Sequence, residues 1–193
     1  MKIRTLALTL CALAFVATSA MAAASEFGLN AGLALPMGDF ADAAGPGFFG
    51  GATYTYHVED MFGLGGDINY HRFGKKSATV GAVSASNELS AVQYGVHGKY
   101  FFKLKSNETP YLKVGLGMYA LSDKASSTGG ATNYSATTSD TKFGYSLGLG
   151  ADWKMSEKSS WGIEALYHNI QTDRKSATMI TVGARYNWLM SGK

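Results

Sequence analysis

The chain has 193 residues and a formal net charge of +3, with 46% hydrophobic and 16% charged residues. This length is typical of one domain whose core is large enough to fold without disulfides, and Cys11 is the only cysteine in the sequence. The near balance of acidic and basic residues argues against nucleic acid as a partner, because phosphate binding needs a clustered basic surface.

The first 22 residues have the pattern of a secretory signal peptide. Lys2 and Arg4 precede an apolar run, which is followed by the small-x-small cleavage signature "AMA" at residues 20–22. The apolar run is shorter than the roughly 20 residues that a membrane-spanning helix needs. We therefore expect export with removal of residues 1–22, and a single domain formed by residues 23–193.

The rest of the chain alternates between apolar and polar residues in eight segments, and no stretch has a helical apolar stripe. In chain order, the predicted strands are 26–35, 48–58, 61–73, 89–102, 111–121, 141–154, 160–170 and 179–188.

The connections between these strands alternate in length. Three are short, whereas four are longer and rich in Gly, Ser, Thr and Ala: 36–47, 74–88, 122–140 and 171–178. Short and long connections therefore fall on opposite ends of the predicted sheet, as in outer-membrane barrels with short periplasmic turns and long external loops. The loop 122–140 is predicted to be solvated and mobile.

Separating each strand by parity gives one apolar face and one polar face. In the strand 141–154, Phe143 and Leu147 share one face, whereas Lys142 and Ser146 share the other. A soluble barrel with an apolar core and a membrane barrel with an apolar exterior both have this alternation. The placement of the aromatic residues has to decide between them.

Aromatic residues of the apolar face gather at the strand ends, and the strand middles favour aliphatic residues and glycine. The ends nearest the short connections carry an aromatic girdle of Phe27, Tyr56, Phe62, Tyr100, Phe102, Trp153, Trp161, Tyr186 and Trp188. Aromatic rings prefer the headgroup level of a bilayer, whereas a soluble core gives no reason to sort them by height. The sequence therefore predicts an all-β, eight-stranded antiparallel transmembrane β-barrel with its apolar face in lipid.

This layout resembles the small eight-stranded outer-membrane barrels, such as the OmpA transmembrane domain and OmpX, and the wider outer membrane protein beta-barrel domain family. The resemblance covers residues 25–188 and includes "LPMGDF" after the first strand and an aromatic-ended last strand. It implies a place in the bacterial outer membrane and contact with lipid and lipopolysaccharide. It also implies recognition of the last strand by the assembly machinery, read here at Tyr186 and Trp188, with Leu189–Lys193 following.

The polar face supplies a predicted lumen charge network. Its members are Asp67, His97, Lys99, Lys113, Lys142, Asp152, Glu164 and Arg185. Strand heights suggest that Glu164 pairs with Arg185 and Lys113 with Asp152, and that Asp67 lies near His97 and Lys99. Paired charges would replace a hydrophobic core and obstruct flow. In the alternative, a narrow gated pore, the pairs exchange partners to open a water path.

No catalytic, cofactor or metal site is predicted. The four histidines differ in strand height and lack metal-binding spacing, and the glycines form no phosphate loop. Lipid A deacylases are also small barrels, but "EALYHNIQTD" has no serine after His168 to act as a nucleophile. We expect a structural or surface-interaction, adhesin-like role with an external ligand at the loops. A narrow pore is the alternative, and an outer-leaflet lipid A-modifying enzyme is the weakest candidate.

Overall fold

The computed structural model describes residues 24–80, 83–128, 134–172 and 176–190, so the predicted signal peptide lies outside the described residues. Within the described ranges the chain forms one short helix and nine strands. They are β1 (Ser25–Met37), α2 (Asp39–Ala43), β2 (Gly45–Glu59), β3 (Phe62–Gly74), β4 (Lys76–Val80), β5 (Val83–Phe101), β6 (Glu108–Thr128), β7 (Tyr134–Ser156), β8 (Ser159–Ile170) and β9 (Ala177–Met190). No helix in this part of the chain has the length and apolarity needed to cross a membrane.

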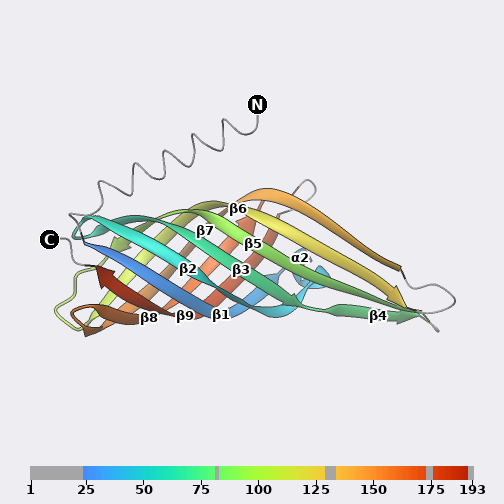
Figure 1. The fold of residues 1–193 in the computed structure, drawn as a ribbon, viewed down its shortest axis with the longest axis horizontal. Helices are drawn as coiled ribbons and strands as arrows, with labels where there is room; N and C mark the ends of the chain where they lie inside the picture. The colour runs from blue at the N-terminus through green and yellow to red at the C-terminus, as the bar shows by residue number, and fades with distance from the viewer. Residues whose placement is uncertain (1–23, 81–82, 129–133, 173–175, 191–193) are drawn as a thin grey trace, which may run out of the picture.

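The strands form one antiparallel sheet that closes on itself through the pairing of β1 with β9 (Figure 1). β3 and β4 pair with successive parts of β5: Arg72 lies opposite Ser90, and Lys76 lies opposite Asn87. β4 therefore continues the line of β3 beyond Gly74 and is not a ninth barrel strand. The prediction of an eight-stranded antiparallel barrel is confirmed.

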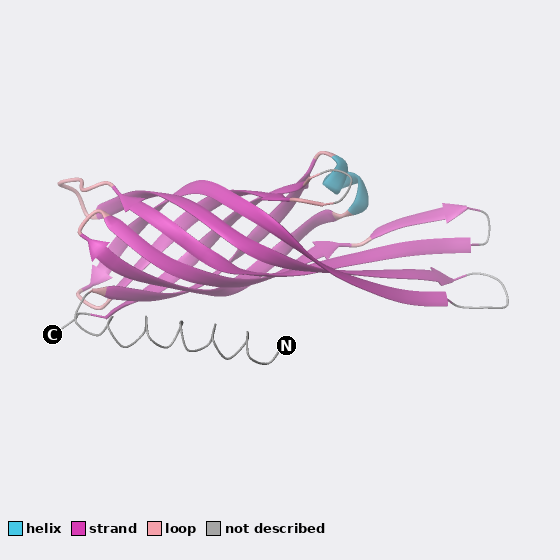
Figure 2. Cartoon of the chain, turned by 90° about the horizontal axis from the view of Figure 1, so that it is seen from above, coloured by secondary structure: helices cyan, strands magenta, loops and turns pink. Residues whose placement is uncertain are grey.

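Two of the predicted long loops are mostly strand. β4 and β5 enter the predicted loop 74–88, and β6 and β7 cover the described part of 122–140, so these residues form strands where loops were predicted. These strands extend beyond the barrel at the end away from the described chain ends (Figure 2). We name the extension, residues 76–80, 83–90, 122–128 and 134–139, the projecting sheet.

The other connections differ from the prediction in smaller ways. The connection 36–47 contains α2, and Gly38 turns the chain into this helix with a φ of 56°, a left-handed conformation that glycine adopts without strain. The last strand also runs further than predicted, because β9 continues past Trp188 to Met190, which lies opposite Ser25.

Burial in the barrel is the reverse of that in a soluble protein. Lys99 and Lys113 are 2% exposed and Arg185 is 4% exposed, whereas Val96 and Leu149 are 64% and 61% exposed. Buried charges destabilise a fold unless they are paired, and soluble monomers rarely expose a continuous apolar band. This arrangement is therefore stable only with apolar surroundings outside and paired charges inside.

The aromatic side chains at the short-turn end pack against one another on the outer surface. The ring centroids of Trp153 and Trp161 are 4.6 Å apart, and those of Tyr186 and Trp188 are 4.8 Å apart. Phe27 stacks on Trp188 at 5.8 Å, across the β1–β9 pairing that closes the barrel. The role of these rings at a membrane interface stays a prediction.

Glycines on the inner face make room for large side chains. Gly150 lies opposite Tyr111, and a Cβ there would overlap the Tyr111 hydroxyl. A Cβ at Gly65 would lie 2.7 Å from Nε2 of His97. An eight-stranded barrel has an interior just wide enough for side chains, so larger residues at these positions would displace the polar groups described below.

The parity of the strands predicts the reaction of single cysteines with a maleimide that partitions into the bilayer. Leu147→Cys and Val182→Cys should react in the membrane-inserted protein, because the native side chains are 54% and 46% exposed. Ser146→Cys and Thr181→Cys, at neighbouring positions that are 3% exposed, should not react. The opposite labelling pattern would indicate a soluble barrel with an apolar core.

Candidate functional site

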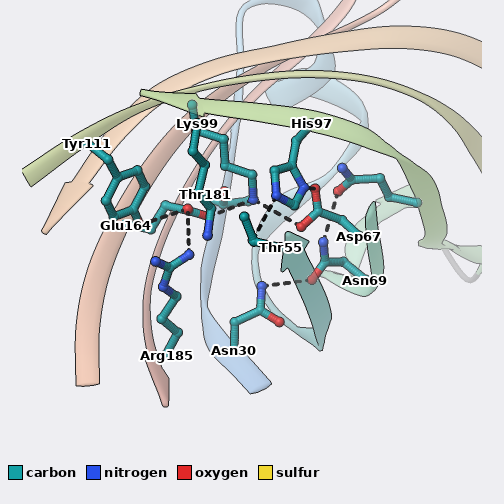
Figure 3. A network of polar contacts seen from close by, with 12 residues as sticks. Asn30, Thr55, Asp67, Asn69, His97, Lys99, Tyr111, Glu164, Thr181 and Arg185 are labelled. Atoms are coloured by element: carbon teal, nitrogen blue, oxygen red, sulfur yellow. Dashed lines mark hydrogen bonds and ion pairs between the residues drawn. The ribbon is translucent and has the colours of Figure 1, made fainter. Parts of the chain in front are cut away.

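One cluster of polar and charged side chains links all eight barrel strands through the interior. We define the central cluster as Glu26, Thr55, Asp67, His97, Lys99, Tyr111, Lys113, Asp152, Glu164 and Arg185 (most of them are drawn in Figure 3). Inner-face positions recur at every second residue of a strand, so each strand presents at least one member without interrupting its apolar outer face.

Lys113 of β6 connects two strands that are not its neighbours. Its Nζ donates to Oδ1 of Asp67 at 3.0 Å and to Oε1 of Glu164 at 3.3 Å. Glu164 also accepts a hydrogen bond of 2.9 Å from the hydroxyl of Tyr111. The ammonium group of Lys113 thus joins β3 to β8 across the interior.

Arg185 of β9 forms the second centre of the cluster. Its Nε donates to Oδ1 of Asp152 at 3.1 Å, and its Nη2 binds the other oxygen of the same carboxylate. Its Nη1 lies 3.5 Å from Oε2 of Glu164, and its Cζ lies 4.7 Å from the centre of the Tyr111 ring. The guanidinium is therefore held by a bidentate ion pair and a cation–π contact.

The remaining members complete the pairing of charges. Nζ of Lys99 donates to Oε1 of Glu26 at 2.6 Å. Nδ1 of His97 lies 2.8 Å from Oδ2 of Asp67, and its Nε2 lies 3.1 Å from the hydroxyl of Thr55. The cluster thus sets four carboxylates against two lysines, one arginine and one histidine, so each carboxylate has a nitrogen partner on another strand.

The structure places seven of the eight residues predicted for the lumen network in this cluster. The eighth, Lys142, forms an ion pair of 2.8 Å with Asp140 near the projecting sheet. The expected Lys113–Asp152 pair is not formed: Lys113 binds Asp67 and Glu164, and Arg185 binds Asp152. Similar height on the strands did not identify the partners, because several carboxylates lie within reach of each cation.

Three members of the cluster were missed in the sequence: Thr55, which has the parity of His57, and two residues at the ends of predicted strands. Glu26 has the same parity as Gly28, which lies on the inner face beside Asn187, but it is the first residue of the predicted strand 26–35. Tyr111 likewise shares the parity of Lys113. Applying the inside–outside alternation to the first residue of each predicted strand would have identified Glu26 and Tyr111 as inner-face residues.

Toward the projecting sheet, the central cluster gives way to a neutral polar layer. Nδ1 of His168 lies 2.9 Å from the hydroxyl of Tyr119, and its Nε2 lies 2.9 Å from the hydroxyl of Thr181. Nε2 of His71 lies 3.2 Å from Oε1 of Gln93. These bonds bring β3, β5, β6, β8 and β9 together across the interior.

An apolar cap lies next to this layer. Its buried members are Ala34, Phe40, Ala44, Phe73, Ala91, Tyr119, Ile170 and Met179. The helix α2 supplies Phe40, whose ring centroid lies 5.1 Å from that of Phe73. The connection between β1 and β2 is therefore folded inward and contributes to the barrel interior.

The histidines are part of this packing. Both ring nitrogens of His168 have side-chain partners, and the hydroxyl partner Thr181 is 3% exposed, so an outer-leaflet lipid cannot reach it. A Ser–His hydrolase needs an accessible hydroxyl beside its histidine. Among the described residues, no group of three or more His, Cys, Asp or Glu side chains is arranged to hold a metal ion.

The outer face of the projecting sheet is rich in hydroxyl groups. Ser77, Ser86, Ser126 and Ser135 lie opposite one another in a row across β4, β5, β6 and β7. Closer to the barrel, Ser90, Ser122 and Ser139 form a second row. Aromatic and aliphatic residues take over on the same face of the barrel, such as Tyr94 and Phe143, which are 46% and 43% exposed. The change in side chains marks the level at which the sheet leaves an apolar environment.

Charges at the base of the projecting sheet are paired. Glu88 binds both Lys75, at 3.2 Å, and Arg72. The hydrogen bond from Lys75 and the charges of both cations hold the pKa of the Glu88 carboxyl below its usual value. In the same way, the hydrogen bond from Lys142 lowers the pKa of Asp140. Both carboxylates therefore keep their charge in mildly acidic surroundings.

The central cluster predicts a ranking of coupling energies. Arg185→Ala should lower the free energy of unfolding by about 3–5 kcal/mol, because it leaves the buried Asp152 without a cationic partner. The double variant with Asp152→Ala should lose clearly less unfolding free energy than the sum of the two single variants. The difference should be larger than in the double variant with Glu164→Ala, because Asp152 makes the bidentate contact. Urea unfolding in detergent measures these values. Lys103→Ala, which breaks an exposed pair with Asp60, is the control and should change little. Purely additive effects would contradict the pairing.

Comparison with known proteins agrees with this architecture. The model of the family described as "Outer membrane protein beta-barrel domain" matches residues 8–187. No curated protein matches the sequence at a significant level.

Solved structures show the same fold at low sequence identity. Neisserial surface protein A, from Neisseria, has a TM-score of 0.57 and 16% identity, with 86% of this chain and 96% of that chain covered. A major outer membrane protein from Thermus thermophilus has a TM-score of 0.57 and 11% identity, with 86% and 99% covered. Ail, the attachment invasion locus protein of Yersinia pestis, has a TM-score of 0.50 and 18% identity, with 86% and 99% covered. Since the family model spans most of the sequence, the chain belongs to the outer membrane protein beta-barrel domain family and resides in the bacterial outer membrane.

Proposed function

We propose that the protein is a surface-interaction, adhesin-like barrel: the closed barrel anchors it in the outer membrane, and the projecting sheet is its external contact surface. The observation that carries this proposal is the extension of β4, β5, β6 and β7 beyond the barrel at the end opposite the short turns. Short turns are periplasmic in outer-membrane barrels, so the extension faces the outside of the cell.

The build of the projecting sheet supports a contact role. Its rows of hydroxyl side chains can donate and accept hydrogen bonds. Its two outer strands also have open backbone edges: in the described chain, β4 pairs only with β5, and β7 pairs with β8 only from Gly144 onward. Open strand edges are available for pairing with another chain.

The interior supports an anchoring role. The central cluster, the neutral polar layer and the apolar cap follow one another along the barrel, and each joins side chains from several strands. Paired charges stabilise a narrow interior and leave little room for solutes. In this proposal the lumen is closed in the resting protein, and the chain performs no catalysis.

Lipid, lipopolysaccharide and assembly partners belong to the same proposal. The apolar band between the aromatic bands would contact lipid tails, and the exposed cations at the external rim would face lipopolysaccharide headgroups. Recognition of β9 by the assembly machinery would use Tyr186 and Trp188. Ail of Yersinia pestis has been crystallised with the heparin analogue sucrose octasulfate, so one barrel of this fold binds an external ligand.

A narrow gated pore is the second candidate, and one observation favours it. Several buried inner-face atoms lack a hydrogen-bond partner in the described structure, among them Oδ1 of Asn30, Nδ1 of His71 and Oδ1 of Asn187. Buried polar atoms usually bind protein groups or ordered water. Water held at these atoms would form the beginning of a path through the lumen.

Planar-bilayer recording separates the two candidates. The refolded full chain should show no steady open level, because the central cluster and the apolar cap close the lumen. Heat-modifiable gel mobility of the same preparation verifies that the barrel is folded. A steady, voltage-independent open level in the native protein would support the pore and contradict the closed barrel.

Shortening both hairpins tests the contact surface. Residues 77–86 and 126–135 are each replaced by an Asn-Gly turn, which joins residues that already lie opposite each other, Lys76 with Asn87 and Ala125 with Ala136. Cells expressing the shortened protein should lose most of the adherence to glycan-coated and matrix-coated surfaces that the native protein confers. The variant should keep its heat-modifiable mobility, which shows that the barrel is intact. Unchanged adherence would contradict a contact role for the projecting sheet.

A further inference from the structure

A cavity of about 490 Å³ lies between α2 and the projecting sheet. It is lined by Asp42, Lys76, Ser77, Ser86, Asn87, Ala125, Ser126, Ser127 and Tyr134. Its volume falls within the range of about 300–1,000 Å³ that is typical of small-ligand sites. By strand parity, Lys76, Asn87, Ala125, Ser127 and Tyr134 belong to the face of the sheet that continues the barrel interior, whereas Ser77, Ser86 and Ser126 belong to the outer face.

The backbone explains why there is space here. On this face, Lys76, Asn87, Ala125 and Ala136 lie opposite one another across four strands. Ala125, which lines the cavity on β6, has a small side chain that leaves space above the sheet. Tyr134, one step nearer the tip and opposite Ser127, is 68% exposed and leaves its ring available at the edge of the cavity.

The cavity presents one carboxylate, one ammonium group and several hydroxyl groups. Asp42, on α2, presents an exposed carboxylate that has no ion-pair partner among the described residues. Nδ2 of Asn87 donates to Oδ2 of Asp123 at 3.4 Å, whereas Oδ1 of Asn87 and Oδ1 of Asp123 are buried without a hydrogen-bond partner in the described structure. Neither of these two oxygens has accessible surface, so the acceptors that a ligand can reach are the Asp42 carboxylate and the hydroxyls of Ser127 and Tyr134, which fit a ligand that brings several donors.

We propose that this cavity is a binding site for a neutral glycan segment of one or two sugar units. Sugar hydroxyls donate to the exposed Asp42 carboxylate, and Lys76 donates to a sugar oxygen. The exposed Tyr134 ring packs against the apolar C–H face of a pyranose, which is flat and matches an aromatic surface. A polysulfated ligand fits less well, because Lys76 is the only cationic side chain among the lining residues and Asp42 would repel the ligand.

This inference names a ligand class for the proposed contact surface and rests on that function, but its test is separate. The hairpin deletion above reports on adherence of whole cells. Sugar binding by the purified chain reports on the cavity alone, so one can fail without the other.

Saturation-transfer NMR and titration in phospholipid nanodiscs test the site. The full chain is used without sugar-headed detergents, which would compete for the cavity. The probes are lactose, maltose, cellobiose and diacetylchitobiose, with sucrose octasulfate as the polyanionic comparison. At least one neutral disaccharide should bind, and more tightly than the polyanion.

Four variants assign the binding to the cavity. Tyr134→Ala and Asp42→Asn should each weaken the affinity by about fivefold or more, whereas Tyr134→Phe, which keeps the ring, should stay close to the native value. Ser139→Ala, on the opposite face of the same sheet, is the matched control and should have no effect. Three results would each overturn the proposal: no binding of any neutral disaccharide, binding unchanged by Tyr134→Ala and Asp42→Asn, or tighter binding of sucrose octasulfate.

Discussion

Pairing of buried charges across the barrel interior is the constraint on which the rest of the structure depends. Each carboxylate of the central cluster is neutralised by a cation on another strand. Lys113 contacts two carboxylates, and Arg185 contacts three. A strand that left its place would leave an unpaired charge in a dry interior, at a cost of several kcal/mol. The cluster therefore fixes the relative positions of strands whose outer faces, being uniformly apolar, would tolerate sliding in lipid.

The same chain meets two environments, and its outer face changes to suit each. Along β7, exposed Leu147 and Phe143 give way to Ser139 and Thr137 as the strand leaves the barrel. In lipid, apolar side chains are favourable on the outer face. Closure of the sheet pairs the backbone N–H and C=O groups of every strand. In water the hydroxyl-rich face keeps the projecting sheet soluble without an apolar layer beneath most of it.

Parity and the sorting of aromatics were sufficient to predict the barrel, its strand number and the inner position of Lys99, Lys113 and Arg185. They could not predict the projecting sheet, because a sheet wetted on both faces has no apolar alternation and its Ser, Thr and Ala content resembles a loop. Nor could they predict that Lys113 selects Asp67 and Glu164 over Asp152, since parity assigns a face and says nothing about which side chains meet across the interior. The inward fold of α2 depends on Phe40 finding Phe73, a contact between segments far apart in sequence.

Continuity of the long strands has a mechanical consequence. The pairing of β5 with β6 runs without a register shift from Phe101 opposite Tyr111 to Ser84 opposite Thr128, and β6 pairs with β7 in the same unbroken way. A pull on the tip of the projecting sheet acts along these strands, so it loads many backbone hydrogen bonds in shear at once and does not peel them apart singly. A force applied at the tip would thus be transmitted to the barrel through continuous, stiff strands, with no hinge between the projecting sheet and the barrel.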